Sequence, residues 1–144
     1  ASVGTQMSRR TDQRRAAAFA VYQQEVTGRG LEDVLDRDAS ELTRALAYAV
    51  EDYREELDEV IGRHAKGWAI GRIAPLEKAI MRVALLEMRH PDVSPGESPI
   101  PAEGAIDEAV ETAKEFCGAE SPGFVNGILG AALREMHDNG ARNG

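Results

Sequence analysis

The sequence predicts an all-α protein, a compact bundle of helices packed around one buried central helix. Apolar residues recur three and four positions apart in several long segments, which is the spacing of one face of a helix. No segment shows the alternation of apolar and polar residues that is typical of a half-buried strand. Residues 75–88, PLEKAIMRVALLEM, are apolar on nearly every side of a helix, which indicates a helix buried among others.

Length and composition indicate one globular domain. The chain has 144 residues, of which 42% are hydrophobic and 29% charged. We expect residues 9–138 to form the domain, residues 1–8 to be a disordered extension or a cloning remnant, and residues 139–144 to be a frayed tail. The sequence shows no signal peptide and no apolar run of membrane-spanning length, so we expect a cytoplasmic protein with no membrane partner. Its single cysteine, Cys117, excludes an internal disulfide.

The first half of the chain predicts three or four helices. Residues 11–26 form the first, which carries arginines in its first two turns and a largely apolar second half, and which ends before Gly28. Residues 31–36 form a short second helix. Asp38 and Glu41 have the spacing of a capping box, and they begin a periodic segment that runs to Ile61. That segment is either one long helix or two nearly collinear ones.

The second half predicts a connector, the central helix and two further helices. An apolar connector that contains Trp68 leads to Pro75, which suits the first position of the central helix. Three prolines between residues 90 and 100 predict a loop. An amphipathic helix then ends near Cys117, and Ser121 followed by Pro122 predicts the start of the last helix, with Ser121 as its cap.

Charge is distributed unevenly along the chain. The formal net charge of −8 argues against a protein that coats nucleic acid wholesale. Residues 8–22, however, hold four arginines against one aspartate, whereas residues 31–63 hold eleven acidic residues against four arginines. This pattern predicts a local anion site beside a surface for a basic partner.

The residues that catalysis would need do not occur in suitable patterns. His64, His90 and His137 lie far apart and lack the paired spacing of metal ligands. No glycine-rich phosphate loop follows a predicted strand. We therefore expect no catalytic residues, no metal and no cofactor.

Two features point to binding instead. Arg10 and Arg14 lie four positions apart, so their guanidinium groups can contact successive phosphates, although surface arginines can also simply solubilise a helix. Arginines at the positive end of a helix dipole oppose that dipole, which favours the anion site. Phe124 falls about 100° from the centre of the apolar stripe of the last helix. Its ring can lean into the core or stack on an unpaired base, and the sequence leaves both alternatives open.

Four stretches of the sequence together resemble the NusB family of bacterial transcription factors. In order, they are RRTDQRRAAAFAVYQQE, PLEKAIMRVALLEM, AIDEAVETAKEF and SPGFVNGILGAAL, and they span most of the chain. The resemblance implies a fold of about seven helices in two small helical halves. It also implies that the protein binds boxA-like single-stranded RNA together with NusE, a ribosomal small-subunit protein. The complex would join the antitermination assembly on RNA polymerase, chiefly during ribosomal RNA synthesis.

The resemblance also implies roles for individual residues. The RNA-binding positions of the family fall on the arginines of the first helix and on the segment that opens the last helix, namely Arg9, Arg10, Arg14, Arg15, Glu120, Ser121 and Phe124. Its partner-binding positions fall on Tyr22 and Glu77.

Two alternatives to a free-standing RNA-binding factor belong to the same resemblance. One is a helical docking module that positions RNA, as in RNA methyltransferases that carry this domain. The other is a homodimer whose interface masks the arginine face.

Overall fold

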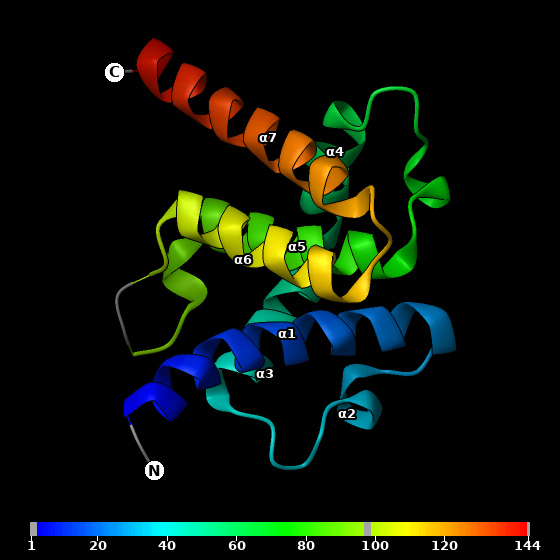
Figure 1. The fold of residues 1–144 in the computed structure, drawn as a ribbon, viewed down its shortest axis with the longest axis vertical. Coiled ribbons are helices and arrows are strands. Elements are labelled where there is room, and N and C mark those ends of the chain that lie inside the picture. The colour runs from blue at the N-terminus through cyan, green and yellow to red at the C-terminus, as the bar shows by residue number, and fades with distance from the viewer. Residues whose placement is uncertain (1–2, 97–98, 144) are drawn as a thin grey trace.

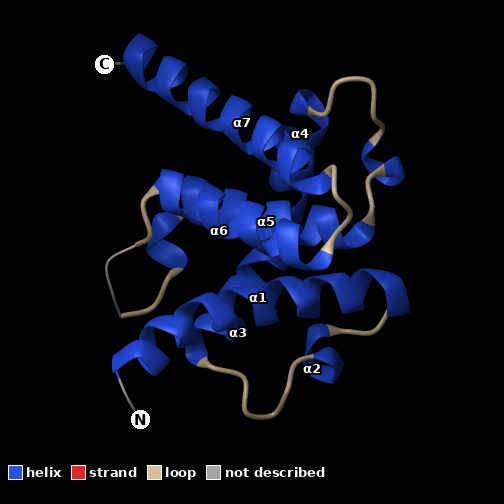
Figure 2. Cartoon of the chain, in the orientation of Figure 1, coloured by secondary structure: helices blue, strands red, loops and turns tan. Residues whose placement is uncertain are grey.

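The computed structural model describes the backbone of residues 3–96 and 99–143 and the side chains of residues 10–96 and 99–140. Within these ranges the chain is helical and has no strand, which confirms the predicted all-α class (Figure 2). The helices, including the two 3₁₀ helices η1 and η2, are α1 Val3–Thr27, α2 Leu31–Val34, α3 Glu41–Asp52, α4 Arg54–His64, η1 Ile70–Arg72, α5 Pro75–Arg89, η2 Pro91–Val93, α6 Ala102–Phe116 and α7 Ser121–Asn143.

Helix α5 is the centre of the fold, as its sequence predicts. It contacts α1, α3, α4, α6 and α7, and every residue from Lys78 to Met88 is buried. Pro75 occupies the first turn, where its missing N–H leaves no hydrogen bond unmade. Because α5 is covered on all sides, the other long helices can be apolar on one face only.

The remaining helices pack around α5 in two groups (Figure 1). Helices α1 and α3 pack against each other and against one side of α5, while α6 and α7 pack against each other and against another side. Helix α4 lies behind α5 and also contacts α7. The connections 65–74 and 117–120 lie on the same side of the molecule, near the start of α5.

Several helix boundaries differ from the prediction. Helix α1 begins at Val3, not near residue 11, and α7 continues to Asn143, so the helical conformation enters both predicted loose ends. The periodic segment is two helices, because Tyr53 separates α3 from α4. The cap of α3 is Ser40, whose hydroxyl accepts a hydrogen bond from the Thr43 N–H, and not Asp38. Serine and aspartate cap helices equally well, so composition alone does not decide between them.

The connector between α4 and α5 is not uniformly buried. Ile73 is buried against the core, but the Trp68 side chain is 54% exposed. Gly67 has φ +79°, a left-handed conformation that turns the chain out of α4 at little cost for glycine. The short η1 helix follows, and it leaves the indole ring of Trp68 at the surface beside the start of α7.

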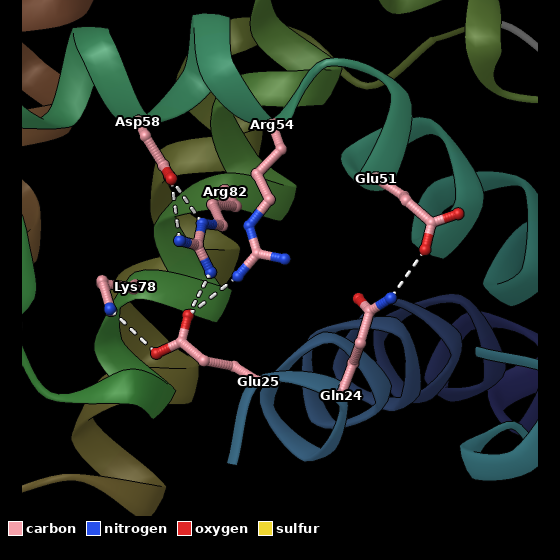
Figure 3. Close-up of polar contacts among 7 residues, drawn as sticks. All are labelled: Gln24, Glu25, Glu51, Arg54, Asp58, Lys78 and Arg82. Carbon is pink, nitrogen blue, oxygen red and sulfur yellow. Dashed lines mark hydrogen bonds and ion pairs between the residues drawn. The ribbon is translucent and has the colours of Figure 1, made fainter. Parts of the chain in front are cut away.

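A buried network of ion pairs joins α1, α4 and α5 (Figure 3). Arg82 of α5 is only 2% exposed, and it donates to both carboxylate oxygens of Asp58 at 2.7 and 3.0 Å and to Glu25 at 2.9 Å. Glu25 also binds Lys78 at 2.8 Å and Arg54 at 3.2 Å. Burial by itself would raise the pKa of Glu25, but its hydrogen bonds to Lys78 and Arg82 outweigh burial and hold the pKa below its ordinary value.

A second set of polar contacts fixes α4 against its neighbours. Glu56 lies 2.8 Å from both Arg89 and His90, and the His90 ring stacks on Tyr53 with centroids 3.9 Å apart. At the other end of α4, Arg63 binds Glu135 of α7 at 2.6 Å, and hydrogen bonding from Arg63 lowers the pKa of Glu135 to about 2. Each end of α4 is therefore tied to a different helix.

Replacement of Ile80 tests the central position of α5. Ile80 is 3% exposed, so Ile80→Ala should lower the free energy of unfolding by about 2–5 kcal/mol through lost burial and the cavity left behind. Urea unfolding followed by circular dichroism measures this loss. As a control, Val26→Ala removes two methyl groups from a side chain that is 49% exposed, and its effect should stay within about 0.5 kcal/mol. Equal effects of the two variants would contradict the assigned burial of α5.

Candidate nucleic-acid interface

Arg14 projects from α1 into the junction with α5. Its Nε donates to both oxygens of Glu87, at 2.9 and 3.2 Å, and the two side chains are 11% and 2% exposed. Burial raises the pKa of Glu87 above its ordinary value, although the hydrogen bond from Arg14 and the charge of Arg10 act in the opposite direction. Arg14 therefore compensates a buried acidic group of the central helix.

Arg15 lies nearer the surface, against the end of α6. Its Nη1 pairs with Glu115 at 2.7 Å, and its guanidinium lies 5.4 Å from the centroid of the Phe116 ring. The Glu115 side chain is 54% exposed, so this ion pair is open to solvent and screened by it. The Nε of Arg15 is buried and makes no hydrogen bond to any described side chain or backbone group. Arg15 can thus exchange its surface carboxylate for another anion at low cost.

The remaining arginines of the set, Arg10 and Arg9, precede Arg14 and Arg15 on α1. Arg10 is half-buried, and its charge acts on Glu87 across the same junction. Thr11, one residue further on, donates to Glu108 of α6 at 3.0 Å. Arg9 belongs to α1, but its side chain lies outside the described residues. The arginine-rich turns of α1 thus lie over α5 and α6, where acidic side chains accompany them.

Phe116 connects the arginines to the start of α7. Its ring is 44% exposed and meets Phe19 of α1 edge-on, with centroids 5.1 Å apart. Phe116 also lines a recess of about 450 Å³ together with Glu77, Glu120 and Ser121. The last residue of α6 therefore borders both the Arg15 guanidinium and the loop that leads into α7.

A second recess continues the surface beyond that loop. It has a volume of about 170 Å³ and brings Phe124 beside Trp68, with ring centroids 6.2 Å apart at an angle of 68°. Glu77, Glu120 and Ser121 line this recess as well. We use the term aromatic track for the surface defined by Arg15, Phe116, Phe124 and Trp68.

Ser121 was predicted to cap the last helix, but its hydroxyl contacts α5 instead. It is the first residue of α7 and is buried, and its hydroxyl donates to Glu77 Oε2 at 2.5 Å. It therefore fixes a carboxylate of α5, and this contact lies between the two recesses.

Cys117 lines the larger recess beside Ser121. Burial raises the pKa of its thiol above the ordinary value, so the thiol stays protonated near neutral pH.

The structure thus brings the predicted RNA-binding residues into two groups that adjoin each other. Arg10, Arg14 and Arg15 form one on α1, and Glu120, Ser121 and Phe124 form the other at the start of α7. Phe124 is half-buried, packs against the core and also borders a recess, so its ring leans on the core, and its stacking on a base stays a prediction.

The two predicted partner-binding residues lie near the start of α5. Glu77 is in its first turn. Tyr22 is half-buried and follows Phe19 by three residues and precedes Glu25 by three, so these side chains share one face of α1. Phe19 contacts the end of α6 and Glu25 contacts Lys78, so this face of α1 borders the Glu77 region.

Sequence reasoning did not identify Phe116, Trp68 and Arg72 as candidates. Phe116 precedes a break at Gly118, and Trp68 follows Gly67, so both aromatic residues stand at the ends of elements. A large aromatic residue beside a chain break is a usable signal, but only the fold shows that these rings approach Arg15 and Phe124. Arg72 lines the recess with Trp68 and carried no signal of its own.

Neither a metal-binding cluster nor a membrane-spanning helix occurs in the described part of the chain. Among the described residues, no group of three or more histidine, cysteine, aspartate or glutamate side chains could hold a metal ion. No helix in the described ranges has the length and apolar character needed to cross a bilayer.

Comparisons with known proteins agree on one family. The sequence profile of the NusB family matches residues 11–134. The transcription antitermination protein NusB of Rubrobacter xylanophilus is 38% identical over an alignment of 132 residues, which covers 88% of this chain and 90% of that protein.

Solved structures show the same fold. NusB of T. maritima superposes with a TM-score of 0.76 at 29% identity, covering 88% of this chain and 91% of the other. A structure of the antitermination factors NusB and NusE in complex with double-stranded RNA superposes with a TM-score of 0.74 at 22% identity, covering 90% and 98% of the two chains. These likenesses confirm the predicted NusB-like arrangement of seven α-helices.

Removal of Arg14 tests the pairing with Glu87. Arg14→Ala leaves a buried carboxylate unpaired, so it should cost about 3–5 kcal/mol of stability at neutral pH. Because the folded-state pKa of Glu87 is already raised above 4.5 and rises further in the variant, the folded state takes up a proton before the unfolded state does. The deficit should therefore shrink as the pH falls from neutral towards 4.5, as measured by urea unfolding at several pH values.

The double variant Arg14→Ala/Glu87→Gln is the matched control. It has no titratable group at position 87, so its own free energy of unfolding should lack the recovery that the single variant shows as the pH falls. If the single and double variants show the same pH profile, the pairing of Arg14 with Glu87 is not what stabilises this junction.

Proposed function

Because this chain belongs to the NusB family, we propose that it is a transcription antitermination factor that binds boxA-like single-stranded RNA together with the ribosomal protein NusE. In this proposal the complex joins the antitermination assembly on RNA polymerase and supports ribosomal RNA transcription. The protein performs no chemistry on the RNA and acts by binding alone.

The aromatic track is the observation that carries the proposal. Single strands are bound by cationic groups that follow the backbone and by aromatic rings on which bases stack. Arg15 and Phe116 supply one such pair of groups, and Phe124 with Trp68 supplies further rings along the same surface. Arg10 and Arg14 lie beside Arg15 on α1, with Arg9 one residue before Arg10, while Glu120 and Ser121 border the track at the start of α7.

In the absence of RNA, carboxylates of the protein already occupy two of these arginines. Arg14 and Arg15 already pair with Glu87 and Glu115, so a phosphate must compete with carboxylates. The Arg14 pair is buried and remains in place, whereas the Arg15 pair is exposed and can exchange. Arg15 is therefore a proposed phosphate-binding group, Arg10 is proposed as a second one from its place on the same turns of α1, and Arg14 supports them structurally.

Docking of NusE is proposed at the region that contains Tyr22 and Glu77. The structure of NusB and NusE with RNA supports a joint complex in the family fold. The acidic excess of residues 31–63 gives the body of the protein a charge suited to a basic ribosomal protein. Electrostatic complementarity of this kind chiefly increases the association rate and fixes the orientation of the partners.

Titration of a boxA-like RNA and of a scrambled RNA, each with and without NusE, tests the proposal. The boxA-like strand should bind more tightly than the scrambled strand, and NusE should increase that difference. Glu77→Lys should abolish the increase due to NusE, because it places a cation opposite a basic partner. The folded state should persist in this variant. Equal affinity for both RNAs in the presence of NusE would refute the proposed function.

The salt dependence of binding tests the arginines separately. Each phosphate contact to a single strand contributes about −0.7 to the log–log salt slope, so Arg10→Ala/Arg15→Ala should make the slope shallower by about 1.4. The matched control is Arg29→Ala/Arg37→Ala, which removes two exposed arginines outside the track and should leave the slope unchanged. Conversely, Glu115→Gln should tighten RNA binding, because it removes the carboxylate that competes for Arg15. An unchanged slope in Arg10→Ala/Arg15→Ala would place the phosphate contacts elsewhere.

A further inference from the structure

The recess between the α4–α5 connection and the start of α7 is built unlike the rest of the surface. Its volume is about 170 Å³, and the groups that line it are two aromatic rings, two carboxylates, one hydroxyl and one guanidinium, with two small aliphatic side chains, namely Trp68, Arg72, Ile73, Ala74, Glu77, Glu120, Ser121 and Phe124. Trp68 is 54% exposed here, although tryptophan is among the residues whose burial stabilises a fold most. Such an exposed ring next to a recess indicates a flat apolar ligand.

The two rings form an open corner. Their centroids lie 6.2 Å apart and their planes meet at 68°, so the ring face of Trp68 does not cover that of Phe124. A planar group that enters the recess can stack on one ring and meet the other edge-on, both of which are favourable aromatic geometries. A nucleobase is the planar group that a single strand provides.

The carboxylates restrict which part of a nucleotide can enter. Glu77 and Glu120 both line the recess, and two negative charges repel a phosphate from its interior. Arg72 is exposed at the same recess, so the phosphate that follows the base can lie outside, against its guanidinium. The base thus points inward and the backbone passes over the rim.

The carboxylates also select among bases. Ser121 donates to Glu77 Oε2 at 2.5 Å, which orients this carboxylate on the rigid central helix and leaves Oε1 able to accept from a base. A carboxylate accepts a hydrogen bond from the exocyclic amino group of cytosine. Uracil carries a carbonyl oxygen at the same ring position, and this oxygen would face the carboxylates without a proton between them.

We propose that the recess lined by Trp68, Phe124, Glu77 and Glu120 binds one unstacked nucleobase that carries an exocyclic amino group, and that it discriminates against uracil. The base stacks on Trp68, its amino group donates to Glu77 or Glu120, and Arg72 binds the adjoining phosphate. This inference rests on the proposed RNA-binding function. It adds that the recess distinguishes one base from another.

Oligocytidylate and oligouridylate of nine nucleotides test the proposal directly. The two strands have the same backbone and ring size and differ at the reading edge, where cytosine has an amino group at C4 and an acceptor at N3, and uracil has a carbonyl group at C4 and an N–H at N3. Fluorescence anisotropy of an end-labelled strand, at low salt, measures affinity for the chain. Oligocytidylate should bind at least about fivefold more tightly, the lower end expected for one good contact to a base edge.

The chain carries its own probe of the recess. Trp68 is the only tryptophan, so a base stacked on it should quench the tryptophan emission of the protein. Oligocytidylate should quench this emission at saturation, and a similarly saturating concentration of oligouridylate should quench it less. The double variant Trp68→Phe/Tyr48→Trp moves the indole to α3, outside the recess, and its emission should be insensitive to either strand.

Three substitutions and one control variant separate stacking from base reading. Trp68→Leu should weaken oligocytidylate binding by about fivefold or more, the lower end of the effect of losing one stacked base, while Tyr48→Ala, which removes another exposed ring, should not. Glu120→Gln replaces an acceptor by an amide that can donate to uracil, so it should reduce the preference for cytidine to about twofold or less. Glu77→Gln should act in the same direction if Glu77 is the carboxylate that reads the base. Circular dichroism of each variant checks that the helical fold is retained.

The outcomes distinguish this inference from the function on which it rests. If RNA binds by anisotropy but cytidine and uridine strands bind equally and Trp68 emission does not change, the recess does not read a base, and the proposed function stands. The same conclusion follows if neither Glu120→Gln nor Glu77→Gln alters the preference. If no RNA binds, boxA-like RNA included, both proposals fail together.

Discussion

The interaction on which the rest of the structure depends is the buried network around Arg82. A guanidinium that is 2% exposed cannot remain charged in the core unless carboxylates surround it, and here Glu25 and Asp58 supply them from α1 and α4. These contacts favour one relative placement of the three helices, since displacement of either neighbour would remove a carboxylate from Arg82. Through Glu25 this network fixes the second half of α1 on α5 and thereby directs its arginine-rich first half over α6.

Acidic and basic groups alternate across the whole interface between α1 and the α5–α6 pair. Lys78 and Arg82 meet Glu25 near one end, Arg14 meets Glu87 further along, and Arg15 meets Glu115 at the surface. The first two sets are largely buried, whereas the Glu115 side chain of the third is 54% exposed, and a pair becomes easier to exchange as it becomes more exposed. A protein with a net charge of −8 can thus present exchangeable cations at one place without being basic overall.

The sequence was sufficient for the fold class and for the central helix, because those depend on local periodicity. It was insufficient for the polar contacts. Arg82 and Glu87 interrupt an apolar segment, and nothing near them in the sequence indicates partners 24, 57 and 73 residues away.

Ser121 has the sequence signature of a helix cap, yet tertiary packing places its hydroxyl against Glu77. Trp68 belongs to the predicted apolar connector, yet the turn at Gly67 leaves its side chain exposed. The arginines and Phe124 could be selected because the arginines oppose the dipole of their own helix and Phe124 lies off the apolar stripe of the last helix. Phe116 and Trp68, the rings that Arg15 and Phe124 approach, show no such conflict in the sequence.

The length of α7 has a practical consequence for how the protein can be attached to other molecules. The helix starts at the aromatic track and continues for 23 residues, a span of roughly 34 Å at 1.5 Å per residue. Its far end lies on the opposite side of the molecule from the connections at residues 65–74 and 117–120 (Figure 1). A surface tether, a fluorophore or a fused domain joined at that end would therefore hold the molecule in a defined orientation, with the track facing away from the point of attachment.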